Sequence, residues 1–121
     1  MSTPTAAELR AATDELRTEL ATTTEAVAGV VRLEPSLRNA LRRLRTGTTV
    51  LLNGRAVRSA ADGIELHRRE DVVDVHVDVV TDLSRPAALT AREVRHSLGA
   101  LVVERGLQAG SVTVAVLSIE H

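Results

Sequence analysis

Asp74, His76 and Asp78 are the residues of this chain whose types and spacing come nearest to a chemical site. Side chains two positions apart on a strand point to the same face, so an extended segment would place all three together. Glu65 and His67 have the same spacing, and a neighbouring strand would bring them onto that face. Carboxylates and imidazoles are ligands that a divalent metal accepts, so this face is a candidate metal site.

A solvated sheet face accounts for the same pattern, and we favour that interpretation. Residues two apart on a strand are about 7 Å apart, so a single strand rarely chelates one ion. Antiparallel sheets commonly leave one polar face in water. His96 and His121 have no Ser, Cys or acid at a spacing typical of a catalytic triad. We therefore expect no catalytic residue, metal or cofactor, and we expect that the protein is not an enzyme.

The best candidate for anion binding is a row of arginines, Arg38, Arg42 and Arg45, with Arg43 beside them. A helix from about Pro35 to Arg45 would place the row opposite its apolar face. Guanidinium groups bind nucleic-acid phosphates, anionic lipid headgroups and acidic protein surfaces. A solvated helix face is the competing interpretation. Recognition of single-stranded RNA is disfavoured, because the chain has no aromatic residue on which bases could stack.

The elements that position these residues follow from the periodicity of the second half of the chain. Apolar residues alternate from Val72 to Val80, then recur at helical spacing from about Ala91 to Arg105, then alternate again from about Val112 to Ile119. This order predicts a two-layer α+β fold. We expect a mixed or largely antiparallel sheet with amphipathic helices mainly on one face. Thr90 and Glu93 form the sequence pattern of a capping box, which predicts that the helix begins there.

The first half of the chain is expected to add a helix, a short strand, a second helix and a hairpin. The first helix spans about Pro4 to Glu25, and its N-terminal half is expected to fray because threonines dilute its apolar stripe. The short strand is Val30 to Leu33. Asn53-Gly54 predicts a hairpin turn, and Ile64 to Arg68 pairs with the strand that starts at Val72. We treat residues 1–25 as an N-terminal helix, partly mobile, and 26–121 as a single domain.

Strand edges are a possible interaction surface. If the last strand or the Asn53-Gly54 hairpin lies at an edge of the sheet, it can pair with another copy of the chain. An internal position is equally compatible with the sequence, so both alternatives stay open.

Composition excludes several classes of site. Without cysteine there is no disulfide, thiolate metal site or cysteine nucleophile, and without lysine there is no phosphate-binding loop of the Gly-x4-Gly-Lys type. The N-terminus has no apolar segment typical of a signal peptide, and no apolar run is long enough to cross a bilayer. We expect a cytoplasmic location, with membrane contact only at the inner face and through a partner.

The order of these segments resembles the alkaline shock, or envelope stress response, family of small bacterial proteins. The resemblance lies in Val27 to Leu33, Gly63 to Leu66, Val73 to Val80, Val94 to Arg105, and the closing stretch from Gly106 to Val116. It implies a non-enzymatic protein that self-associates, in some members docked to a small membrane-anchored protein. It implies no catalytic residues. The Arg-mediated nucleic-acid-binding module is the alternative function.

Overall fold

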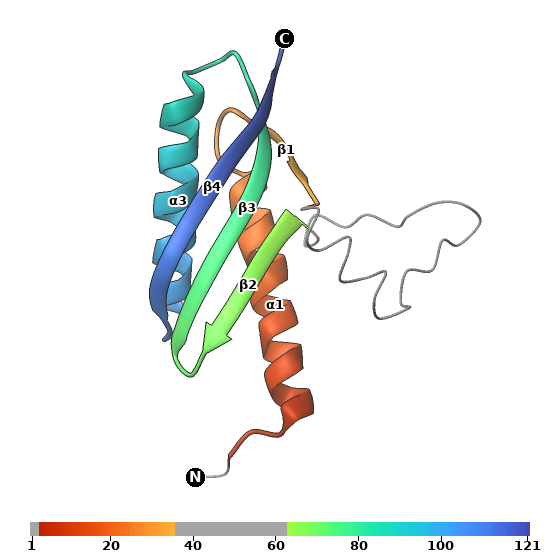
Figure 1. The fold of residues 1–121 in the computed structure, drawn as a ribbon, viewed down its shortest axis with the longest axis vertical. Helices are drawn as coiled ribbons and strands as arrows, with labels where there is room; N and C mark the ends of the chain where they lie inside the picture. Colours follow the sequence, from red (N-terminus) through yellow and green to blue (C-terminus); the bar gives the residue numbers. More distant parts are fainter. Residues whose placement is uncertain (1–2, 36–62) are drawn as a thin grey trace, which may run out of the picture.

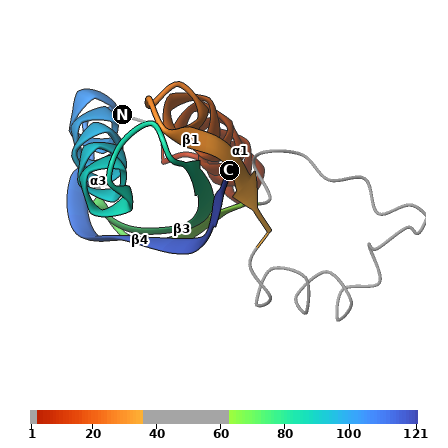
Figure 2. The same ribbon diagram turned by 90° about the horizontal axis from the view of Figure 1, so that it is seen from above.

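The computed structural model describes residues 3–35 and 63–121. In these residues two helices cover one face of a four-stranded sheet (Figures 1 and 2). This arrangement confirms the predicted two-layer α+β fold with its helices on one face. The elements in chain order are α1 (Ala6–Glu25), β1 (Val30–Glu34), β2 (Ile64–Arg69), β3 (Val72–Asp82), α3 (Ala87–Glu104) and β4 (Gln108–Glu120).

The sheet is mixed, and β3 lies at its centre. Strand β4 runs parallel to β3 along the whole of one edge, from the pair Val72 and Gln108 to the pair Asp82 and Glu120. The other edge of β3 carries two antiparallel strands end to end, β2 against its first half and β1 against its second half. A parallel pair needs a crossover connection, and α3 supplies it between β3 and β4.

The core lies between the sheet and the two helices, and its apolar side chains are all aliphatic. Every second residue of β3 points into it, as the alternation predicted, and the helices contribute side chains at helical spacing. Helix α3 lies over β4, and α1 lies over β1 and β2 (Figure 2). The residues that β3, α3 and α1 contribute to the core cluster are Val73, Val75, Val77 and Val79 on β3, Val94, Leu98, Leu101 and Val102 on α3, and Leu16, Leu20 and Ala21 on α1.

Helix α1 begins with a capping box one residue after the predicted Pro4 start. The Thr5 hydroxyl accepts a hydrogen bond from the Glu8 backbone N–H, and the Glu8 carboxylate accepts one from the Thr5 N–H. Every residue from Ala6 to Ala12 is exposed, and burial starts only in the second half of the helix. The thin apolar stripe of the sequence therefore corresponds to a helix that is anchored at its C-terminal end.

Helix α3 begins a turn earlier than predicted, and the predicted capping box is wrong. The helix starts at Ala87 after Pro86, with no side-chain cap. Thr90 lies inside the helix and is fully buried, since it continues the stripe of Val94 and the residues that follow. It packs against Gly29, where a Cβ would lie 2.5 Å from the Thr90 hydroxyl oxygen. The Thr90 side chain is therefore part of the core packing and does not cap the helix.

The remaining boundaries agree with the sequence patterns or extend them. The hairpin of β2 and β3 turns at Glu70, which has a left-handed φ of 55°. Strand β4 is longer than expected at both ends. The predicted helix from Pro35 to Arg45 and the Asn53-Gly54 hairpin lie outside the described residues.

Neither α1 nor α3 is a candidate membrane span. Within residues 3–35 and 63–121, no helix has the length and apolar content needed to cross a bilayer.

Candidate functional site

The polar face of the sheet, on the side away from the helices, gathers the residues singled out in the sequence. The register of β2 and β3 places Glu65 opposite His76 and His67 opposite Asp74. These four side chains line a groove of about 450 Å³. Strand β4 supplies Ser111 and Thr113 to the same groove, and sequence reasoning had not assigned these two residues to it. The predicted common face is therefore confirmed, and it is wider than predicted.

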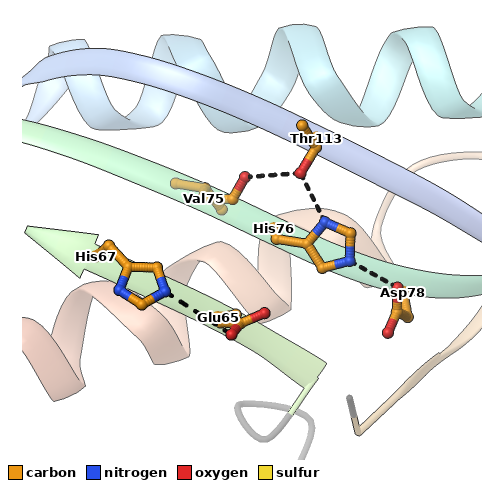
Figure 3. A network of polar contacts seen from close by, with 6 residues as sticks. All are labelled: Glu65, His67, Val75, His76, Asp78 and Thr113. Atoms are coloured by element: carbon orange, nitrogen blue, oxygen red, sulfur yellow. Dashed lines mark hydrogen bonds and ion pairs between the residues drawn. The ribbon is translucent and has the colours of Figure 1, made fainter. Parts of the chain in front are cut away.

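His76 lies at the centre of a hydrogen-bonded row on this face (Figure 3). Its Nε2 lies 2.8 Å from the Asp78 carboxylate, and its Nδ1 lies 2.6 Å from the Thr113 hydroxyl. Because an ionised carboxylate only accepts, Nε2 donates to Asp78 and Nδ1 of a neutral ring accepts from Thr113. In the protonated ring both nitrogens donate, and the Thr113 hydroxyl can then turn to the Val75 carbonyl oxygen, 3.5 Å away. The row links β3 to β4 in either state.

Glu65 and His67 form a second pair on β2 (Figure 3). Their side chains approach to 3.8 Å, between Glu65 Oε1 and His67 Nε2, and become an ion pair only when His67 is protonated. The Glu65 side chain is 7% exposed and that of His67 is 53% exposed. The imidazole therefore faces water, and the carboxylate does not.

The Asp74 carboxylate binds the backbone of strand β4. Its Oδ1 accepts the Ser111 backbone N–H at 2.8 Å, and its Oδ2 lies 3.0 Å from the Arg69 guanidinium. The hydrogen bond from Ser111, followed by the charge of Arg69, lowers the pKa of Asp74 below its ordinary value. A larger residue in place of Gly110 would force the Asp74 carboxylate to move, because a Cβ there would lie 2.1 Å from Oδ1. The strand register shifts at this point, where β4 carries one residue more than β3 between successive pairs.

These contacts turn the carboxylates of the polar face toward different partners. Asp74 faces Arg69 and Ser111, while Asp78 faces His76. Within the described part of the chain, no group of three or more histidine, aspartate or glutamate side chains is arranged to hold a metal ion. The polar face thus consists of side chains that bond to one another across strands, and it exposes a shallow groove with two imidazoles.

Arg38, Arg42, Arg43 and Arg45 are outside the described residues, so their role in binding anions stays a prediction. His96 is exposed on α3.

The sequence left open whether the last strand lies at an edge or inside the sheet. In the described sheet, β4 lies at an edge. Among the described strands it pairs with β3 alone. Its outer edge is a second candidate site, one that acts through backbone groups rather than through side chains.

Comparison with known proteins identifies the fold. No family model and no curated protein matches the chain. Among solved structures, a double variant of MamM-CTD is 11% identical, with a TM-score of 0.51 over 92% of this chain and 99% of its own. A single variant of the MamM CTD is 11% identical, with a TM-score of 0.50 over 91% of this chain and 99% of its own. At this identity the likeness extends to the fold alone.

Proposed function

We propose that this chain is a non-enzymatic interaction protein of the envelope, or alkaline, stress response. It acts by self-association and by docking to a small membrane-anchored partner. The stress response and the membrane-anchored partner are supported by the resemblance of the segment order to that family. Self-association is supported by a structural observation, the outer edge of β4.

That edge has the properties of a surface that is covered in an assembly. Strand β4 has 13 residues, about twice the length of a typical strand. An edge strand presents a row of backbone N–H and C=O groups that another extended chain can pair with. Natural monomers protect such edges with charges, prolines or short strands, and β4 has neither a proline nor a charge before Glu120.

Exposed apolar side chains accompany the edge. Leu117 and Ile119 on β4 are 56% and 46% exposed, and Val103 on α3, the helix that packs on β4, is 62% exposed. Single exposed apolar residues are ordinary on a protein surface. Here they coincide with an unprotected strand edge, which favours a contact surface over the polar groove as the functional feature.

The test of self-association is molar mass as a function of concentration. The chain has no Trp or Tyr, so light scattering is combined with refractive-index detection rather than absorbance at 280 nm. We expect the mass to exceed 12.9 kDa for one chain and to rise with concentration at micromolar levels. A mass that stays at one chain up to millimolar concentration contradicts the proposal.

The finer part of the proposal is tested by fractionating native cells that carry a tagged copy. Recovery with membranes, together with a small membrane-spanning protein, supports docking to an anchored partner. Recovery with nucleic acid that is lost as salt rises would instead support the Arg-mediated alternative.

A further inference from the structure

We propose that two copies of this chain pair β4 against β4, antiparallel and about a two-fold axis that passes near Val114. This inference rests on the proposed self-association and adds its geometry. The pairing would join the two described sheets into one continuous eight-stranded sheet, with both pairs of helices on the same face.

The first support is that nothing on the strand opposes such a pairing. Every residue from Gln108 to Ile119 is uncharged, so an antiparallel partner of the same sequence meets no like charge along this stretch. Glu120, the one ionisable residue of β4, is already bound at 2.6 Å by Arg32 of β1. Its carboxylate is therefore drawn toward the opposite edge of the sheet and away from the free edge.

The second support is the position of the irregularities along β4. The pairing with β3 shifts register twice, once between Ala109 and Val112 and once between Val116 and Ser118. Irregularities of this kind bend an edge strand and interrupt its regular pairing. They leave the run from Val112 to Val116 in unbroken register with β3. This run is the segment best shaped to accept another strand, and Val114 is its central residue.

The third support is what the two faces of that run would bring together. Val112, Val114 and Val116 pack against the core on the helix side and are only partly buried. With Val114 on the axis, the Val114 side chains of the two copies face each other, and Val112 of each copy faces Val116 of the other. Cross-strand pairs of β-branched residues stabilise a sheet, so the aliphatic core would continue across the interface.

The opposite face of the run points to the same occupant. Thr113 of one copy would face Ala115 of the other, a small uncharged pair. The run offers no charge by which a charged peptide would be recognised, whereas it is complementary to itself. Thr113 and Ser111 line the polar groove, so the pairing would place two grooves on one face, one on each side of the axis.

Helix α3 would enlarge the contact beyond the strands. Two five-residue strands bury less than the roughly 800 Å² per partner of a stable interface. Because α3 lies over β4 (Figure 2), a continuous sheet would bring the two α3 helices to either side of the axis on one face. The exposed Val103 belongs to that helix.

Charge variants on the Thr113 and Ala115 pair test the proposed register. In Thr113→Asp/Ala115→Asp, like charges face each other across the axis, and we expect the dissociation constant of the dimer to rise at least 100-fold. In Thr113→Arg/Ala115→Asp, opposite charges face each other, and we expect the dissociation constant of the dimer to lie within about tenfold of the wild-type value. Both variants lose the same Thr113 hydroxyl. If both weaken the dimer equally, with unchanged far-UV circular dichroism, the proposed register is overturned.

Cysteine cross-linking supplies a second test, because the chain contains no cysteine of its own. Across an antiparallel pair, residues on the axis have Cα atoms about 4.5 to 5.5 Å apart, within reach of a disulfide. Under mild oxidation we expect Val114→Cys to form a covalent dimer, and the control Ser84→Cys, in an exposed turn after β3, to stay monomeric. Equal cross-linking of the two variants overturns the pairing.

The two levels of the proposal fail in different ways. If the wild type is a monomer at all concentrations, self-association is wrong and the pairing with it. If the wild type associates but neither the charge variants nor Val114→Cys behaves as expected, only the β4 pairing is wrong and the contact lies elsewhere.

Discussion

The strongest internal test of the fold is a matched pair of substitutions on helix α1. Leu20 is fully buried against the sheet, and Leu9, on the same helix, is 41% exposed. Leu→Ala at a buried site costs the transfer free energy of the side chain plus the cavity left behind, about 2 to 5 kcal/mol. At Leu9 little apolar area leaves water and no closed cavity forms, so we expect a loss of about 1 kcal/mol or less.

The comparison isolates packing, because both variants make the same chemical change in the same helix and alanine favours the helix equally in each. We would measure urea unfolding by circular dichroism at 222 nm, since the chain has no aromatic fluorophore. For Leu20→Ala we expect the midpoint temperature in a parallel thermal scan to fall by about 10 °C or more.

The same measurement tests the division into a helix of residues 1–25 and a domain of 26–121. If α1 unfolds as part of the domain, Leu20→Ala shifts the single cooperative transition. If the helix is an independent, mobile segment, the main transition stays where it is in the wild type. Equal stability of the Leu20→Ala and Leu9→Ala proteins would refute the packing of α1 described above.

Three further outcomes are expected on the polar face and on α3. Gly110→Ala should cost about 1 to 3 kcal/mol in chemical unfolding, because the new Cβ would displace the Asp74 carboxylate and leave the Ser111 N–H without its acceptor. Asp74→Asn should lower stability at neutral pH, and the difference in stability from the wild type should shrink below about pH 4. Because the pKa of Asp74 is lowered in the folded state, its ionised carboxylate stabilises the fold above the ordinary Asp pKa of about 3.9, and this stabilisation is lost as the pH falls through the folded-state pKa. A difference in stability that does not depend on pH would contradict this. Thr90→Val should leave stability unchanged or raise it by about 1 kcal/mol, because the buried Thr90 hydroxyl has no hydrogen-bond partner within the described part of the chain; a clear loss in urea unfolding would mean that the hydroxyl is bonded.

The parts of the fold that the sequence predicted are those in which one local period decides the structure. The alternation in β3 places its valines in the core and its polar residues on the outer face, whichever strands flank it. The stripe from Val94 to Val102 likewise depends only on helical spacing. Such patterns need no knowledge of the neighbouring elements.

The parts that the sequence did not predict depend on contacts between distant segments. Thr90 has the local pattern of a cap, yet it is buried because Gly29, 61 positions earlier, leaves room for it. The polar face was predicted from β2 and β3, but Ser111 and Thr113 joined it only because β4 lies parallel to β3. The crossover connection through α3 determines that β4 lies beside β3, and the alternating pattern within β4 does not indicate which strand will be its neighbour.

The position of β4 at the edge follows from the same crossover, and it changes how its composition is interpreted. An uncharged, valine-rich strand is ordinary when neighbours flank it on both sides, because both of its edges are then paired. The same strand at an edge lacks the charges and prolines that keep monomers apart. In this chain the other edge of β3 is occupied by β1 and β2, so β4 is the described strand whose free side runs the full length of the sheet. An unprotected edge of this kind favours pairing with a further strand, which is why we assign the proposed function to the outer edge of β4 rather than to the polar groove.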